Sequence, residues 1–340
     1  MTMLATSPTP APPDDVDVQV LRDTPAHFAR LKAELGRRIV GQDASIRDLF
    51  VALIAQGHCL MIGVPGLAKT LLVKSLAEAS DLMFRRIQFT PDLMPSDITG
   101  SEILEETDDG KRAFRFTAGP VFTQLLLADE VNRAPAKTQS ALLEAMQEHR
   151  VTTAGTTRPL PQPFFVLATQ NPIEQEGTYP LPEAQLDRFM FCLNLDYPNT
   201  AEEVRILHET TGAPPPPLTP VFTAKTLTEL QHAVRRVHVP ASVADFAVRL
   251  VQATRPNAPQ APAIVKRCIQ WGAGPRATQS LALAAKANAA LDGRLNCAVD
   301  DIAAAAKIVL RHRIILNYRA EADQITADKL IDELMKAVRP

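Results

Sequence analysis

Short, continuous apolar runs recur through the first two hundred residues of the chain. Runs of this length and composition are typical of strands that are buried on both faces of a parallel sheet. The runs cover residues 59–62, 84–89, 125–129, 164–169 and 191–195. We therefore predict an α/β fold with a parallel five-stranded sheet flanked by helices.

Apolar positions spaced by three and four residues occupy much of the remaining chain and predict helices. The expected helices are 20–35, 44–56, 136–147, 201–211, 227–237, 243–253, 277–290, 300–309 and 327–338. Beyond Tyr197-Pro198 this helical period dominates, and a stiff proline-rich linker occupies 212–217. We predict a sheet domain over residues 19–198 and an all-helical domain over 199–340. The Pro- and Asp-rich residues 1–18 are predicted to be a disordered tail.

Two hairpins are predicted inside the sheet domain. Residues 91–124 are too many for a simple crossover, and their apolar segments 102–104 and 114–116 flank an acidic turn at Asp108-Asp109-Gly110. The second hairpin covers residues 151–160 and turns at Ala154-Gly155. On the helix between these hairpins, Gln139 is expected to face outward.

Composition and charge exclude several classes of function. The 340 residues are 46% hydrophobic with a net charge of −2, and no basic stripe favours nonspecific nucleic-acid binding. The longest apolar run, 49–55, is far below the ~18 residues of a membrane helix. No Lys or Arg precedes Arg22, so no basic secretory signal is expected. Four widely separated cysteines predict buried thiols in a reducing compartment, and we expect a cytoplasmic protein.

The most informative chemistry follows the first apolar run. Residues 63–70 form a predicted loop between a strand and a helix. The backbone N–H groups of such a loop, together with the dipole of the helix, can bind phosphate. The residues of the loop, with the next helical residue, are Gly63, Val64, Pro65, Gly66, Leu67, Ala68, Lys69, Thr70 and Leu71. Lys69 would reach the β- and γ-phosphates of a nucleotide, and the Thr70 hydroxyl would ligate Mg²⁺. Ala68 replaces the usual second glycine, and we expect a backbone conformation there that is open to residues with a Cβ.

Polar residues at the ends of later strands would complete such a site. Asp129 would hold Mg²⁺ and Glu130 would polarise the attacking water, although two acids can also be a solvated strand end. Asn171 could bind the γ-phosphate or the water, or could simply be a cap or turn residue. Val40, Gly41 and Gln42 could form either an interhelix turn or a wall of the adenine pocket.

Two arginines farther along the sequence are further candidates for functional residues. Arg188 could pair with its neighbour Asp187 at the surface, or could reach the nucleotide of an adjacent subunit. Arg276 begins a helix, where a cation opposes the dipole, so it is either solvated or held by an anion. We favour the anion. His312, between two arginines, is expected at the domain surface.

The order of these motifs resembles that of AAA+ ATPases, and more narrowly that of the MoxR family in the helix-2-insert clade. The matching segments, in addition to the loop 63–70, are 129–135, 168–172, 181–189, 274–277 and 309–314. The resemblance implies the Walker A loop at 63–70, Walker B at Asp129-Glu130, sensor 1 at Asn171, the arginine finger at Arg188 and sensor 2 at Arg276. It also implies that 91–124 is the helix-2 insert, that 151–160 is the pre-sensor-1 hairpin and that the C-terminal helices form a lid.

The same resemblance implies activity and partners. Such proteins bind ATP with Mg²⁺, with the nucleotide between the sheet domain and the lid, hydrolyse it and form ring-shaped homo-oligomers, usually hexamers. MoxR-type ATPases are chaperone-like remodellers that mature or activate a client enzyme complex. They often insert metal cofactors, and they commonly work with a von Willebrand factor A domain partner.

Two other functions fit parts of the pattern. A helicase-like motor of the same clade would present a basic hairpin to nucleic acid, whereas the hairpin 151–160 offers threonines and only Arg158. A nucleotide-gated binding module without hydrolysis would not need the intact pair Asp129-Glu130. We therefore predict an ATP-hydrolysing remodeller.

Overall fold

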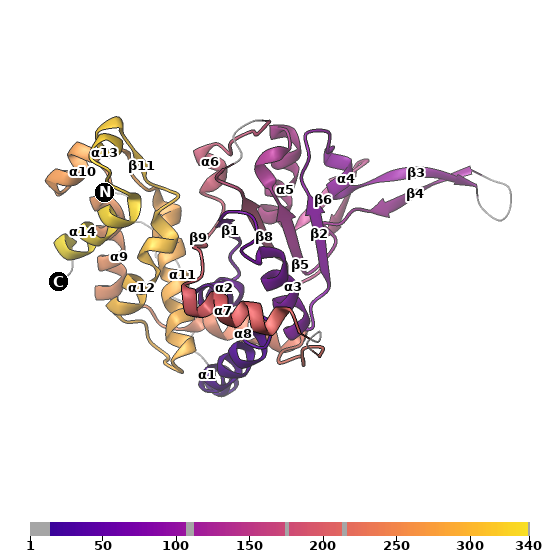
Figure 1. The fold of residues 1–340 in the computed structure, drawn as a ribbon, viewed down its shortest axis with the longest axis horizontal. Coiled ribbons are helices and arrows are strands. Elements are labelled where there is room, and N and C mark those ends of the chain that lie inside the picture. Colours follow the sequence, from indigo (N-terminus) through magenta and orange to yellow (C-terminus); the bar gives the residue numbers. More distant parts are fainter. Residues whose placement is uncertain (1–13, 107–111, 174–176, 213–215, 339–340) are drawn as a thin grey trace, which may run out of the picture.

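The computed structural model describes residues 14–106, 112–173, 177–212 and 216–338. Figure 1 shows a sheet domain, a C-terminal group of helices beside it, and one long hairpin that projects from the sheet domain. The acidic turn 108–110 and residues 213–215 of the predicted linker lie outside the described residues.

The predicted parallel sheet is confirmed, with the strand order β2-β5-β8-β1-β9. Its strands are β1 (Cys59–Ile62), β2 (Phe84–Gln88), β5 (Leu125–Asp129), β8 (Phe165–Gln170) and β9 (Phe191–Asn194). Ile62 pairs with both Gln170 and Asn194, and Gln88 pairs with Asp129. The carboxyl ends of all five strands therefore meet at one edge of the sheet, and their amino ends meet at the opposite edge.

Alternate residues of the strands enter two different cores. Cys59, Met61 and Leu127 face a core shared with α1 (Asp15–Leu35), α2 (Asp43–Ile54) and α3 (Lys69–Ala79). Leu60 and Leu126 face a second core formed mainly with α5 (Ala136–Glu148). Burial on both faces explains why these strands are continuous apolar runs in the sequence.

The C-terminal helices continue the first core. They are α8 (Ala224–Arg236), α9 (Ala241–Ala253), α10 (Ala263–Cys268), α11 (Pro275–Leu291), α12 (Val299–Leu310), α13 (Tyr318–Ala322) and α14 (Ala327–Val338). α11 packs against α1 and α2, and α8 packs along α1. Within this group of helices, the short strands β10 (Ile269–Trp271) and β11 (Ile315–Leu316) pair with each other.

Both predicted hairpins are present. β3 (Gly100–Glu106) and β4 (Arg112–Ala118) form the projecting hairpin (Figure 1), which follows the short helix α4 (Pro95–Thr99). β6 (Arg150–Thr153) and β7 (Thr156–Pro159) form the second hairpin. The guanidinium of Arg158 stacks over the Phe116 ring at 3.9 Å, so the two hairpins contact each other.

Two sequence predictions need correction. The predicted tail 1–18 is wrong for residues 14–18, because α1 begins at Asp15 and is capped by Asp14 and Asp17; residues 1–13 lie outside the described residues. Arg236 of α8 forms ion pairs with both acids, which gives this polar end a tertiary partner. Gln139 is buried rather than exposed, and its amide donates to three backbone carbonyls that satisfy it there.

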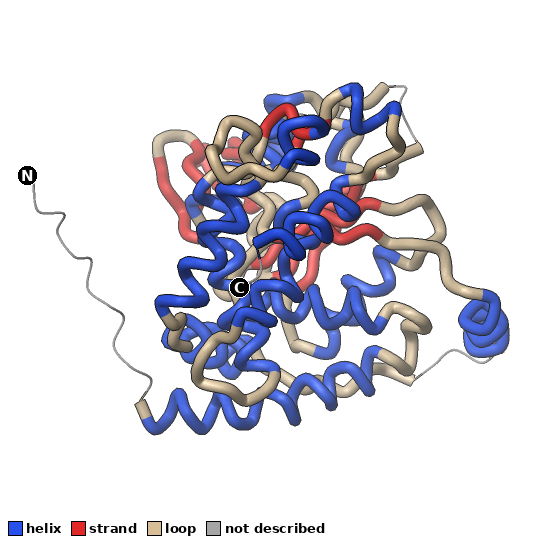
Figure 2. The backbone as a smooth tube through the Cα atoms, turned by 90° about the vertical axis from the view of Figure 1, so that its left-hand side faces the viewer, coloured by secondary structure: helices blue, strands red, loops and turns tan. Residues whose placement is uncertain are grey.

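One helix stands apart from the body. α7 (Thr200–Thr210) follows β9 and contains no buried residue. Val204 and Leu207 are exposed on it at 49% and 59%. Figure 2 shows this helix at the right-hand margin of the molecule, connected to it by loops.

Candidate nucleotide site and the opposite arginine cluster

The loop between β1 and α3 has the geometry of a phosphate cradle. Gly66 has φ +89° with open space around the position of a Cβ, so its backbone can be approached closely. Lys69 Nζ donates to the carbonyl of Gly63 and, at 3.3 Å, to that of Val64, so the ammonium group lies over the loop. Thr70 follows in the first turn of α3, where the helix dipole favours anions.

Ala68 departs from the sequence expectation. Its φ of +54° and ψ of +24° lie in the left-handed region, which glycine favours and which costs a residue with a Cβ about 1–2 kcal/mol. The expectation of a conformation readily open to such residues is therefore wrong. The strain lies directly before Lys69, at the turn that starts α3.

A cavity of about 310 Å³ adjoins this loop. Val40, Gly41 and Gln42 all line it, as do Leu67 and Leu71. Gln42 Nε2 donates to the Leu67 carbonyl at 3.0 Å, so the wall and the loop are joined. Ile206 and Thr210 of α7 also line the cavity.

Gly41 permits a close approach of α7 to this cavity. Its φ is +76°, and a Cβ there would lie 2.5–2.8 Å from the carboxyl group of Glu202 on α7. Gln42 Oε1 is buried and lacks a hydrogen-bond partner among the described residues, which leaves an acceptor available beside the cavity. The structure thus brings the wall residues next to the phosphate loop, as the pocket interpretation requires.

Asp129 ends β5 at the same edge of the sheet and is buried. Arg86 of β2 binds its Oδ2 through Nε at 3.0 Å and Nη2 at 2.7 Å, and the Thr169 hydroxyl donates to Oδ1 at 2.6 Å. Asp129 is therefore not a solvated strand end. Its charge is already compensated by a guanidinium group.

Glu130 adopts a left-handed conformation with φ +56° and ψ +50°. Its backbone N–H donates to Thr169 Oγ1 at 2.8 Å, and its Oε2 accepts from Gln88 at 2.7 Å and from Arg133 at 3.1 Å. Several contacts thus hold a strained residue in place, a situation common at functional sites.

Asn171 follows β8 and is buried. Its Oδ1 accepts a hydrogen bond from the Ile173 N–H at 3.2 Å, which is the turn role considered from the sequence. It lies at the carboxyl edge with the loop, Asp129 and Glu130, because Gln170 pairs with Ile62.

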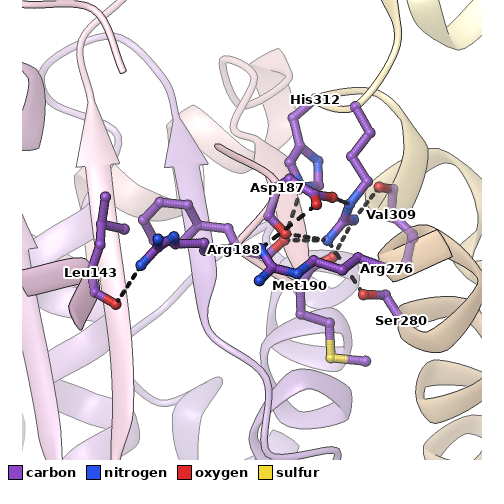
Figure 3. Close-up of polar contacts among 10 residues, drawn as sticks. Leu143, Asp187, Arg188, Met190, Arg276, Ser280, Val309 and His312 are labelled. Carbon is purple, nitrogen blue, oxygen red and sulfur yellow. Dashed lines mark hydrogen bonds and ion pairs between the residues drawn. The ribbon is translucent and has the colours of Figure 1, made fainter. Parts of the chain in front are cut away.

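Arg188 and Arg276 lie at the opposite, amino edge of the sheet. Arg188 comes three residues before β9, and its exposed side chain donates to the Leu143 carbonyl of α5 at 3.3 Å. It points away from Asp187, as Figure 3 shows, so of the two alternatives considered for Arg188 the structure does not show the surface pair with Asp187. A surface hollow of about 490 Å³ lies beside Arg188 and is lined by Glu144 and Glu148 of α5.

Asp187 instead binds arginines of the helical domain. Arg276 Nη1 lies 3.8 Å from Asp187 Oδ2, so an anion does hold this cation at the start of α11. Arg313 Nε donates to Asp187 Oδ1 at 2.7 Å. Because the cluster precedes β9 and the loop follows β1, which pairs in parallel with β9, this arginine cluster and the phosphate loop occupy opposite ends of the strands.

His312 is also placed differently from the expectation. It is not at the domain surface: its Nε2 contacts the Phe189 carbonyl at 3.0 Å, and burial holds its pKa well below the ordinary value. The sequence pattern around it, two flanking arginines, suggested solvent exposure. The arginines are themselves bound to the sheet domain, which the pattern alone does not reveal.

Sequence reasoning missed the polar partners of the two acids. Arg86 and Gln88 alternate along β2 and so share the face that meets Asp129 and Glu130. Two arginines within an apolar strand were a usable signal, since charged groups in such strands need partners. Thr169 offered no comparable signal.

The comparisons with known proteins agree with this arrangement. Residues 58–191 match the family described as the ATPase family associated with various cellular activities (AAA), and residues 261–334 match the AAA lid domain. Over 305 residues the chain is 44% identical to Chaperone MoxR1 of Mycobacterium tuberculosis, with 90% of this chain and 80% of that protein covered. The chain belongs to the MoxR family of AAA+ ATPases.

Further relatives extend over nearly the whole chain. Protein MoxR of Methylorubrum extorquens is 30% identical over 334 residues, covering 93% of this chain and 95% of that protein. A crystal structure of a candidate ATPase from Cytophaga hutchinsonii superimposes with a TM-score of 0.87 at 42% identity, covering 95% and 96% of the two chains. The MoxR fold, an AAA+ sheet domain with a helical lid domain, is thus shared along the chain.

The residues present fit ATP with Mg²⁺, the nucleotide typical of AAA+ proteins. Mg²⁺ is commonly bound by one or two protein oxygens together with substrate phosphates, and Thr70 and Asp129 offer oxygens of this kind. Among the described residues there is no group of three or more His, Cys, Asp or Glu that could hold a metal by itself. Within the same residues, every helix is too short or too polar to cross a bilayer.

Proposed function

We propose that this MoxR-family protein hydrolyses ATP in a homo-oligomeric ring and uses the energy to remodel a client protein. The observation that carries the proposal is the division of the candidate site between the two edges of the sheet. The loop, the acids and Asn171 lie at the carboxyl edge, whereas Arg188 and Arg276 lie at the amino edge.

Each residue at the carboxyl edge has a role in this proposal. The loop 63–70 binds the phosphates, Lys69 binds the β- and γ-phosphates, and Val40, Gly41 and Gln42 enclose the base. Mg²⁺, held by Thr70 and Asp129, supplies charge neutralisation at the transferred phosphate. Arg86 must then exchange its present partner Asp129 for another.

Glu130 orients and polarises the attacking water, and Asn171 donates to the water or the γ-phosphate. The left-handed backbone of Glu130 is over-determined by Thr169, Gln88 and Arg133. Such fixed placement is what a water-positioning carboxylate needs, because misplacement by 1 Å can cost about 10²-fold in rate.

Arg188 acts on the nucleotide of the adjacent subunit. Its distance from the loop of its own chain and its exposed position beside a surface hollow both support this arrangement. Arg276 belongs to the same cluster, so we place its action in the adjacent site as well. An arginine supplied by a neighbour is worth ~10³–10⁵ in rate where measured.

The biological role follows from family membership. We propose chaperone-like maturation or activation of a client enzyme complex, including metal-cofactor insertion, together with a von Willebrand factor A domain partner. A relative is named a chaperone, which supports the remodelling role. Ring assembly, usually hexameric in this clade, is part of the same proposal.

Arg188→Ala tests the division of the site. We expect the variant to bind ATP normally and to lose turnover by 10²-fold or more. Fluorescent-nucleotide binding and steady-state ATPase assays would measure both, with Arg267→Ala, at an exposed arginine of the helical domain, as the matched control. Full ATPase activity in Arg188→Ala would reject the assignment.

Glu130→Gln tests the chemistry itself and offers a route to partners. The variant should bind ATP and retain it unhydrolysed, because the amide cannot polarise water. Affinity capture with this variant plus ATP should then hold the client and the partner. Normal hydrolysis by the variant would show that Glu130 is not the activating carboxylate.

The helicase-like alternative gains no support from the second hairpin. Arg158 stacks on Phe116 and lies 3.8 Å from Glu102, and Arg150, the other basic residue of these two strands, lies 3.0 Å from Glu148, so both are engaged within the protein. A basic residue held in this way is not presented to a nucleic-acid strand.

A further inference from the structure

The turn Arg311–Arg313, directly after α12, binds the segment that contains Arg188. Arg311 donates to the Cys192 carbonyl at 3.2 Å, and His312 contacts the Phe189 carbonyl at 3.0 Å. Three consecutive residues of the helical domain thus bind the backbone between Asp187 and Cys192, with Arg313 making most of the contacts. We call residues 311–313 the anchor turn and residues 187–190 the finger segment.

Arg313 is the centre of this contact. Its side chain is 2% exposed, and its N–H groups donate to Asp187 Oδ1 at 2.7 Å, to the Phe189 carbonyl at 2.7 Å and to the Met190 carbonyl at 3.0 Å. Further donations reach the Asp187 carbonyl at 3.2 Å and the Val309 carbonyl of its own domain. A guanidinium group has five N–H donors, and most of them are used on the residues that flank Arg188.

The geometry fixes the backbone on both sides of Arg188 and leaves its side chain exposed. Asp187 precedes it and Phe189 and Met190 follow it, and all three accept hydrogen bonds from Arg313. Arg276 pairs with the same Asp187. Both arginines proposed to act on the neighbour's nucleotide therefore depend on one contact between the domains.

Stability alone does not explain a buried arginine here. Burial disfavours the charged form and lowers the pKa of Arg313, and buried ion pairs often add little net stability compared with apolar residues of similar volume. What the guanidinium supplies, and an apolar residue cannot, is a fixed set of hydrogen bonds to successive backbone groups.

We propose that Arg313 is a positioning residue for hydrolysis in the adjacent subunit. Arg313 connects the helical domain to the finger segment. The position of the Arg188 side chain therefore depends on the position of the helical domain relative to the sheet domain. A change of domain position in one subunit would thus alter catalysis in the next. The inference rests on the proposed action of Arg188 between subunits.

Arg313→Lys is the first test, because it keeps a cation but removes the planar fork of donors. We expect nucleotide affinity within about twofold of the native protein and kcat reduced by about 10²-fold, as for a misplaced catalytic group. The control is Arg249→Lys, the same change at an arginine of α9 paired with Asp245, far from the finger segment. A loss of affinity with unchanged kcat would contradict the positioning role.

Mixed rings identify the site on which Arg313 acts. Lys69→Ala removes the nucleotide site but leaves the arginine side of the subunit intact. Rings assembled from equal amounts of Lys69→Ala and Arg313→Lys subunits should regain activity, since the intact Arg188 of one faces the intact loop of the other. Mixing Arg313→Lys with Arg188→Ala should give no recovery, because both defects lie on the same side.

The opposite pattern would overturn the inference. If Arg313 serves the nucleotide of its own subunit, Arg188→Ala subunits will rescue it and Lys69→Ala subunits will not. Failure of Lys69→Ala to rescue Arg188→Ala would instead reject the proposed function, so the two failures are distinguishable. Should Arg313→Lys not fold, Asp187→Asn weakens the same contact from the sheet domain and enters the same mixing experiment.

Discussion

His58, the residue immediately before β1, is completely enclosed beneath the finger segment. Its Nε2 lies 3.0 Å from the Met146 carbonyl, and its Nδ1 accepts from the Val166 N–H at 3.0 Å. Both ring nitrogens are therefore satisfied in the neutral form. Protonation would place a second N–H against the Val166 donor, and burial lowers the pKa of His58 to about 4.

This environment predicts a loss of stability in acid. An unfolded chain protonates His58 near pH 6.5, whereas the folded chain resists until about pH 4. The contribution to the free energy of unfolding is complete above pH 6.5 and falls by up to about 3 kcal/mol as the pH drops to about 4. Burial raises the pKa of Asp48 to about 6, which acts in the opposite direction over part of this range.

A variant without the titrating imidazole separates the effect of His58 on stability from that of Asp48. In urea unfolding at several pH values, His58→Gln should be less stable than the native protein at pH 7, and the gap should narrow towards pH 4.5. His232→Gln, at an exposed site, serves as the control. Parallel stability curves for the native protein and His58→Gln would contradict the prediction.

Single residues also mark the limit of sequence reasoning. The loop 63–70 was predictable because phosphate binding requires small residues and a Lys-Thr pair at fixed spacing. The left-handed conformation of Ala68 was not, because an alanine gives no local indication of positive φ. The burial of Gln139 depends on carbonyls supplied by Val131, Ala134 and Tyr179, which become neighbours only in the folded chain.

At the scale of elements, the two hairpins act as one unit. Arg158 on β7 stacks on Phe116 of β4, and the Phe116 ring meets Phe122 edge-on with ring centres 5.7 Å apart. A cation–π contact of this kind contributes about 0.5–2 kcal/mol. This contact joins the base of the projecting hairpin to the strand pair that precedes β8 and Asn171.

Arg158→Ala should loosen the projecting hairpin without unfolding the domain. We expect faster amide hydrogen exchange in β4 and little change in the melting temperature, because the lost contact lies outside both cores. Arg115→Ala is the matched control, since Arg115 pairs with Glu105 within the same hairpin and is 75% exposed. Equal exchange rates in β4 of the native protein and Arg158→Ala would show that the stacking contact does not hold the hairpin.

The sheet strands and the long helices were predictable from the sequence, whereas the shortest helices were not. The five sheet strands and the long helices follow from apolar runs and helical spacing over many residues. α4 and α6 (Glu183–Leu186) contain five and four residues, too few to show a period. The first turn of α1 was missed because its acids looked like a polar tail, whereas Arg236 is their partner in the fold.

At the scale of the whole molecule, the candidate residues of one chain are divided between the two edges of its sheet. The sequence marked Arg188 and Arg276 as candidates, and it left open which anion holds Arg276. The sequence did not specify the edge of the sheet at which Arg276 lies. That depends on how α11 packs against α1 and α2, which no local pattern encodes.

Activity should therefore depend on protein concentration. In the proposed ring, the ATPase rate per subunit should rise with concentration and reach a plateau as rings assemble, because Arg188 of one subunit would serve the nucleotide site of its neighbour. Sedimentation velocity on the same samples would relate the rate to assembly. A constant rate per subunit in samples that remain monomeric would contradict catalysis shared between chains.

The detached helix α7 has a consequence for the end of the reaction cycle. No residue of α7 is fully buried and Ile206 is its one half-buried apolar side chain, so opening the helix requires only a small part of the free energy that unfolding the domain would need. Because Ile206 and Thr210 form one wall of the cavity beside the loop, that wall can swing away while both cores stay intact. Under the proposed function, release of ADP would then require only a local opening of these eleven residues.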